Sequence, residues 1–287
     1  MFYFDYDLDS ADGSLTHAVF AFPQWRKWYR EYGVAVSIDP KGRTNRFGLP
    51  CIAVVGTSHN GKSIPFFFGF VQSETKQSYT WYMKRFVECY SGRPPPTVVF
   101  TDHEKPLIEA IVHELHTTVR LDAWHLNQNV IKHLGGNEEA KHALFELRHV
   151  TSKTEAEVLA AEFLQRFTSP GHSHWFELWW EDRALWVAAW LSGAEAKFCA
   201  LLNGTNRSEG FNSALASLFG NLRTPLDKVC GVPEALNEKY LRKVEKVETY
   251  EHFESLPRFL WRALSWLQSM HSGAFWRMRK DTRPIGG

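Results

Sequence analysis

The sequence predicts an α/β fold in which a mixed sheet comes first and an all-helical region follows. Short runs rich in β-branched and aromatic residues are concentrated before residue 123, which is typical of strands. From about residue 137 to 200 the apolar residues recur at helical spacing instead. With 287 residues, 44% of them hydrophobic and 23% charged, the chain has the composition of a folded protein of one large domain or two ordinary ones.

The first predicted elements are three antiparallel strands. They cover residues 34–39, 51–57 and 63–71. The link between the last two, "SHNG", contains the Asn-Gly pair that favours a tight hairpin, because both residues tolerate positive φ angles. The sequence therefore predicts a hairpin whose strands lie next to the first strand.

Helices and strands alternate after this hairpin. In "SYTWYMKRFVECY" the aromatic residues recur every three or four positions, which predicts an amphipathic helix. The expected elements are a helix over 78–90, a strand over 97–102, a helix over 104–115, a strand over 117–123 and a helix from 124. This order is that of the ribonuclease H-like fold, in which the first and fourth strands are parallel neighbours.

Two aspartates end the first and fourth of these strands. Neighbouring strands lie about 4.8 Å apart, so Asp39 and Asp102 at matching ends would reach one metal ion. Each has an alternative interpretation: Asp39 as a turn residue before Pro40, and Asp102 as the cap of the following helix.

The helical region has two distinctive features. Thr154 and Glu157 have the spacing of a capping box at the start of a helix. Five tryptophans follow within sixteen residues, and they suit either a packed core or a platform for unpaired bases. They are Trp175, Trp179, Trp180, Trp186 and Trp190.

Charge and cysteine content narrow the class of protein. A formal net charge of +1 lacks the basic excess of a domain that binds DNA tightly by itself. The four cysteines are far apart with no CxxC pair, so neither a disulfide framework nor a cysteine-based zinc module is expected. No run approaches the ~18 apolar residues of a membrane span, and the start "MFYFDYDLDS" is acidic. We therefore expect an intracellular protein without a membrane partner.

Four blocks, in order, resemble the transposase domain of Mutator-like elements, the family that also gave rise to the far-red-response regulators of plants. The blocks are "DPKGRTNRFGLP", "ETKQSYTWYMKRF", "PTVVFTDHEKPLIEAI" and "TNRSEGFNSAL". The resemblance runs from about residue 30 to 220. It implies a ribonuclease H-like core over 1–136, a helical insertion over 137–202 and a last core helix over 203–222, with a helical extension over 223–287.

The resemblance also implies an Asp-Asp-Glu metal site, which here falls on Asp39, Asp102 and Glu209. Two magnesium or manganese ions would activate the attacking oxygen and stabilise the leaving oxygen during DNA strand cleavage and transfer. The implied partners are the transposon's terminal inverted repeats, target DNA and further copies of the chain, in the nucleus. Glu209 has an alternative role as the third residue of a capping box with Asn206.

The stretch "VRLDAWHLNQN" places Asp122 and His125 three residues apart at the end of the strand over 117–123. A structural zinc site is not expected there, because no suitably spaced second pair of ligands follows. The family carries a Cys or Asp, two residues and a His at this point. The resemblance therefore implies an accessory catalytic role for both residues. The alternative is a buried polar pair that holds the strand-to-helix turn.

The chain also departs from the family. Pro40, Lys41, Gly42 and Arg43 replace the usual Thr-Thr-Tyr or Ala-Thr-Tyr after the first aspartate, and no flanking zinc-finger motif is present in this sequence. Three functions follow as hypotheses. The main one is a DNA transposase, and its alternative is a transposase-derived, DNA-associated transcriptional regulator without catalytic activity. A stand-alone nuclease of the same fold is the third.

Overall fold

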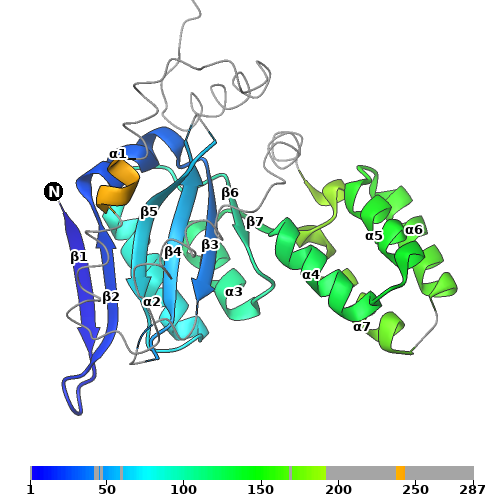
Figure 1. Ribbon diagram of the computed structural model, residues 1–287, viewed down its shortest axis with the longest axis horizontal. Coiled ribbons are helices and arrows are strands. Elements are labelled where there is room, and N and C mark those ends of the chain that lie inside the picture. The colour runs from blue at the N-terminus through cyan, green and yellow to red at the C-terminus, as the bar shows by residue number, and fades with distance from the viewer. Residues whose placement is uncertain are drawn as a thin grey trace, which may run out of the picture.

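The computed structural model describes residues 2–41, 45, 48–58, 61–167, 170–191 and 237–242. A sheet flanked by helices forms one part of the molecule, and a separate group of helices lies beyond the edge strand β7 (Figure 1). The strands are Tyr3–Leu8 (β1), Leu15–Ala21 (β2), Ala35–Lys41 (β3), Cys51–Thr57 (β4), Ser63–Phe70 (β5), Val98–Thr101 (β6) and Thr118–Leu121 (β7). The helices are Pro23–Tyr32 (α1), Lys76–Cys89 (α2), Lys105–Leu115 (α3), Ala123–Leu134 (α4), Glu138–His149 (α5), Lys153–Arg166 (α6) and Pro170–Glu181 (α7), followed by the 3-10 turns Arg183–Leu185 and Ala188–Trp190.

The sheet is mixed, with the strand order β1-β2-β5-β4-β3-β6-β7. β3, β6 and β7 are parallel to one another, and every other neighbouring pair is antiparallel. The prediction that the strand ending at Asp39 lies beside the strand ending at Asp102, and parallel to it, is confirmed. The predicted hairpin of β4 and β5 is also confirmed, and Gly61 in its turn has a φ of +75° that favours glycine.

β1, β2 and α1 were not among the predicted elements. β2 is almost wholly buried because it lies between β1 and β5, so its residues lack the simple alternation of a half-exposed strand. α1 has a proline in its first turn and ends at Gly33, whose N–H donates to the carbonyl of Tyr29. Tyr29 brings α1 into the core, where its ring lies 5.4 Å from that of Phe66 and 5.5 Å from that of Phe86.

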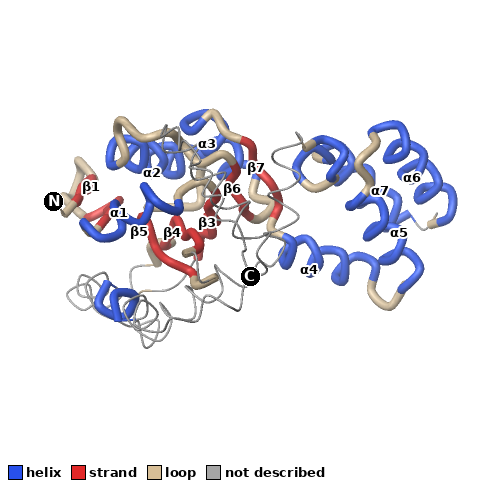
Figure 2. The backbone as a smooth tube through the Cα atoms, turned by 90° about the horizontal axis from the view of Figure 1, so that it is seen from above, coloured by secondary structure: helices blue, strands red, loops and turns tan. Residues whose placement is uncertain are grey.

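α2 and α3 cover one face of the sheet (Figures 1 and 2). The Thr75 hydroxyl accepts from the N–H of Ser78 and caps α2. The buried stripe predicted for this helix is confirmed, and it includes the fully buried Tyr82, whose hydroxyl donates to the carbonyl of Ile52 at 3.1 Å. This bond ties the helix to the middle of the sheet.

α4 to α7 and the two 3-10 turns form a second hydrophobic core. Trp175, Trp179 and Trp186 are buried in it, so the packing role predicted for the tryptophans is confirmed for these three. The cap predicted at Thr154 was wrong. α6 begins two residues earlier, where the hydroxyl of Ser152 accepts from the N–H of Glu155.

The helical unit is attached to the β7 edge of the sheet by polar bonds. The buried guanidinium of Arg120, on β7, donates to the carbonyls of Ala184 at 2.6 Å and Val187 at 3.3 Å. A second bond joins His103 Nε2 to Asp182 Oδ2 at 2.7 Å. The segment after α7 is therefore attached near the carboxyl ends of β6 and β7.

Of the predicted last helix over 203–222 and the extension over 223–287, the structure describes only residues 237–242, which are helical. Tyr240 is 2% exposed and packs into the main core. Figure 2 shows this short helix on the opposite side of the sheet from α2 and α3. Glu209 lies outside the described residues.

Candidate functional site

Three aspartates lie in one row near the carboxyl ends of the parallel strands. Ser37 of β3 pairs with Phe100 of β6, which in turn pairs with Arg120 of β7. Two residues further along each strand, the chain reaches Asp39, Asp102 and Asp122. Because paired residues in a parallel ladder are level with one another, the tertiary structure brings together three of the residues singled out in the sequence.

Asp39 lies inside a strand and not in a turn. β3 was predicted to stop at Asp39, but it continues to Lys41, and Asp39 pairs with Ala53 of β4. The turn interpretation of Asp39 is therefore wrong. Asp39 is half-buried, and its carboxylate is close enough to Tyr79 and Glu104 to influence both.

Asp102 follows β6 directly and is half-buried. Its carboxylate accepts from the N–H of His103 at 2.6 Å, and its carbonyl accepts from the N–H of Glu104 at 2.8 Å. The N-cap residue of α3 is Glu104, so the interpretation of Asp102 as the cap of that helix is wrong. The bond to the neighbouring N–H holds the carboxylate close to the strand end.

Asp122 and His125 hold the turn from β7 into α4. Asp122 is 3% exposed, and its Oδ1 atom accepts from the N–H of His125 at 3.3 Å, as an N-cap residue does. The imidazole Nδ1 lies 3.7 Å from the same oxygen. The N–H of Asp122 donates to the carbonyl of Thr101 at 2.8 Å, which ties this turn to the end of β6. This is the geometry of the polar-pair interpretation, and a catalytic role for either residue stays a prediction.

Glu104 is an acidic residue of this region that the sequence interpretation missed. The hydroxyl of Tyr79, on α2, donates to Glu104 Oε1 at 2.7 Å. In the sequence, Glu104 stands two positions after Asp102 and just before a helix. Negative charge is common near a helix N-terminus, so this position did not indicate a role in the site. The contact of Glu104 with α2 depends on how the two helices pack.

The carboxylates of this region repel one another. Burial raises the pKa of Glu104, and the nearby carboxylates of Glu74, Asp102 and Asp39 raise it further, against the opposing effect of the Tyr79 hydrogen bond. Burial and the Glu104 carboxylate likewise raise the pKa of Tyr79. A cluster that already resists further negative charge is a favourable place for a bound cation.

His103 connects this region to the helical unit. Its ring lies 4.7 Å from that of Trp179 and is bonded to Asp182 through Nε2. The ammonium of Lys105 lies 3.7 Å from the same carboxylate. His103 is therefore fixed at two points: its main-chain N–H donates to Asp102, and its side chain is bonded to Asp182 of the helical unit.

Carboxylate oxygens are the ligands that magnesium prefers, so Asp39 and Asp102 fit a divalent cation by chemistry and by their positions on neighbouring strands. Within the described part of the chain, no group of three or more His, Cys, Asp or Glu side chains is placed to hold a metal ion. The third predicted ligand, Glu209, lies outside that part.

An α/β domain whose parallel strands end on a row of aspartates defines a candidate acidic site. Comparison with known families agrees: residues 35–129 match the MULE transposase domain, a match that covers β3 to β7 and all three aspartates of the row. The predicted family resemblance is confirmed.

The chain is also homologous to plant proteins from Arabidopsis thaliana. It is 27% identical to Protein FAR1-RELATED SEQUENCE 5 over 255 residues, which is 86% of this chain and 31% of that protein. It is 28% identical to Protein FAR1-RELATED SEQUENCE 6 over 56% of this chain and 23% of that protein. Identity to Protein FAR-RED IMPAIRED RESPONSE 1 is 23% over 74% of this chain and 26% of that protein. The chain spans about a third or less of the length of these relatives. In the described residues, no helix is both long and apolar enough to cross a bilayer.

Proposed function

We propose that this chain is the transposase-derived core of a DNA-associated transcriptional regulator that acts in the nucleus. The observation that carries the proposal is its similarity to the FAR1-type proteins, which extends over 86% of the chain for FAR1-RELATED SEQUENCE 5 and so reaches well beyond residues 35–129. The formal net charge of +1 supports a domain that contacts DNA together with other parts of a longer protein.

A second candidate function is the catalytic one, a transposase that cleaves and rejoins DNA at the ends of a Mutator-like element. The row of Asp39, Asp102 and Asp122 favours it, because a scaffold that only binds DNA has no chemical need for aligned aspartates on three neighbouring strands. Asp39 and Asp102, with Glu209, would hold divalent cations that activate the attacking oxygen and stabilise the leaving oxygen. His125 would donate a proton to the leaving oxygen, and Asp122 would orient the imidazole of His125.

One preparation of the full chain tests both candidates. A pool of random-sequence duplex DNA is selected for binding over several rounds, and the same protein is incubated with supercoiled plasmid and Mg²⁺ or Mn²⁺. For a regulator we expect a selected sequence to be enriched and the plasmid to stay intact.

For a transposase we expect metal-dependent nicking that Asp102→Asn abolishes. The matched control is Glu157→Gln, which makes the same chemical change on an exposed part of α6 and should leave nicking unaltered. If no sequence is enriched and no plasmid is nicked, the proposed association with DNA is wrong.

A further inference from the structure

Exposed cations gather at the end of the sheet from which the parallel strands β3 and β6 start. Lys27 and Arg30 are exposed one turn apart on α1, the helix that leads directly into β3. Arg93 is exposed in the loop that leads into β6. No ion pair between described residues involves any of these three side chains. We call Lys27, Arg30 and Arg93 the basic end of the sheet.

Polar bonds hold α1 against the loop that carries Arg93. The guanidinium of Arg26, on α1, donates through Nη2 to the carbonyl of Cys89 at 2.9 Å, where α2 ends. The hydroxyl of Tyr29, also on α1, donates to the carbonyl of Pro94 at 3.1 Å. The two segments of the basic end therefore lie side by side, on a surface that is formed before any partner arrives.

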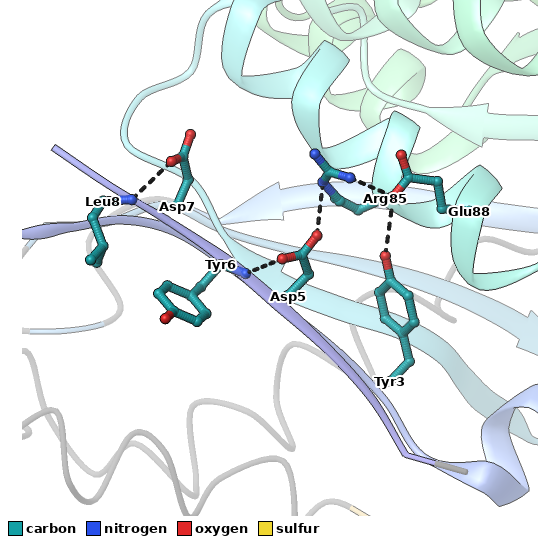
Figure 3. A network of polar contacts seen from close by, with 7 residues as sticks. All are labelled: Tyr3, Asp5, Tyr6, Asp7, Leu8, Arg85 and Glu88. Carbon is teal, nitrogen blue, oxygen red and sulfur yellow. Dashed lines mark hydrogen bonds and ion pairs between the residues drawn. The ribbon is translucent and has the colours of Figure 1, made fainter. Parts of the chain in front are cut away.

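Carboxylates on the elements around the basic end are few or already engaged. Glu88, in the last turn of α2, pairs with Arg85 and accepts from the hydroxyl of Tyr3 at 3.5 Å. Arg85 Nε also lies 3.1 Å from Oδ2 of Asp5, on β1 (Figure 3). α1 has three basic side chains and one carboxylate, Glu31, which leaves it a net charge of +2. The potential at this end is therefore positive.

The opposite end of the same strands is acidic. Asp39 and Asp102 lie there with Glu104, and their carboxylates repel one another. From Ala35 to Asp39, β3 covers about 13 Å at about 3.3 Å per residue, and Figure 1 shows α1 across the end where β3 starts. Without a bound cation, phosphates are repelled from the acidic end and attracted to the basic end. The formal net charge of +1 is thus the sum of two oppositely charged ends.

The residue types at the basic end are those that contact phosphates. Lysine, arginine and serine side chains make most protein contacts with the DNA backbone, and arginine can donate two parallel hydrogen bonds to one phosphate. Ser91 is exposed two residues before Arg93, so a hydroxyl donor is available in the same loop. A duplex carries a charge every ~1.7 Å along its axis, so cations on two adjoining segments can each reach a phosphate.

We propose that the basic end binds the phosphate backbone of duplex DNA through Lys27, Arg30 and Arg93, without a metal ion and away from the aspartate row. The inference rests on the proposed association with DNA and assigns the surface that makes the contact. The DNA lies at the amino ends of the parallel strands, and not near their carboxyl ends, where the catalytic candidate would hold it. These contacts set affinity and position, and do not themselves select a sequence.

Fluorescence anisotropy of a labelled duplex of mixed sequence, titrated with the full chain in EDTA over a range of salt concentrations, tests the proposal. We expect the parent to bind, with the logarithm of the association constant falling linearly with the logarithm of the salt concentration. In a Lys27→Gln, Arg30→Gln, Arg93→Gln variant this slope should become shallower by about 2–3, because each lost phosphate contact removes about 0.9. Affinity at about 0.1 M salt should fall by about tenfold or more.

A matched variant removes the same total charge elsewhere. Lys132→Gln, Lys153→Gln and Arg166→Gln together take three exposed positive charges from α4 and α6 of the helical unit. This variant should keep the slope of the parent, since general attraction alone does not depend on which cations are removed. Circular dichroism spectra that match the parent show that both variants are folded.

The outcomes separate this surface from the proposed function itself. If the parent binds the duplex and the basic-end variant keeps the same slope and affinity, the surface is wrong while the association with DNA stands. A parent that binds only when Mg²⁺ is added places the DNA at the aspartate row, and this also overturns the surface. If the parent binds poly-glutamate and not the duplex, the partner is an acidic protein, and both the surface assignment and the association with DNA are wrong.

Discussion

Replacing Asp122 with alanine separates the structural role of the Asp122–His125 turn from a catalytic one. The substitution removes the side-chain oxygen that accepts from the N–H of His125, so the first turn of α4 loses its cap. Loss of an N-cap of this kind costs up to about 2 kcal/mol, because the N–H of His125 is left without its acceptor. Removing a carboxylate that is only 3% exposed offsets part of this cost. We therefore expect a net loss of about 1–2 kcal/mol in the free energy of unfolding.

Asp122→Asn keeps an oxygen at the same place, and asparagine caps helices about as well as aspartate does. This variant should stay within about 0.5 kcal/mol of the parent. Urea unfolding followed by far-ultraviolet circular dichroism measures all three proteins, with Glu157→Ala on an exposed part of α6 as the control that should change little. If alanine costs nothing, or asparagine costs as much as alanine, the capping role is refuted.

The same pair of variants bears on DNA cleavage. An asparagine variant that is as stable as the parent but no longer nicks DNA would assign Asp122 a role in the reaction. If activity follows stability instead, so that asparagine keeps both and alanine loses both, the role of Asp122 is purely structural.

Three further perturbations test the site and the fold. The pKa of Glu104 is raised, so the folded state holds its proton more tightly than the unfolded chain does. The parent therefore loses stability as the pH rises from the ordinary pKa of 4.5 through the raised value. Glu104→Gln should therefore be more stable than the parent at neutral pH but not at acidic pH in urea unfolding, and an advantage independent of pH would contradict this. Gly56→Ala should cost about 1–3 kcal/mol, because its Cβ would overlap the fully buried ring of Phe66; an unchanged urea midpoint would refute that overlap. Arg120→Met should cost about 2–3 kcal/mol, because two main-chain carbonyls of the segment after α7 lose a charged donor, and limited proteolysis should then cut that segment sooner.

Local patterns predicted the elements of the central sheet well. The Asn-Gly hairpin, the aromatic stripe of α2 and the two runs that end near aspartates each depend on interactions within a few residues. β2 escaped prediction for a different reason. It is buried between β1 and β5, so its own pattern does not distinguish it from other apolar runs.

The candidate site was likewise predictable in part, since its residues could be found from the sequence and their arrangement could not. The acidic residues and their positions near the ends of predicted strands could be found from local composition. That Asp39, Asp102 and Asp122 share one row could not, since their alignment depends on the register of three strands that helices or other strands separate in the sequence. The tertiary structure also decided that Tyr79 reaches Glu104 and that Asp182 of the helical unit reaches His103. Contacts between residues far apart in the chain are set by packing, and no local pattern encodes them.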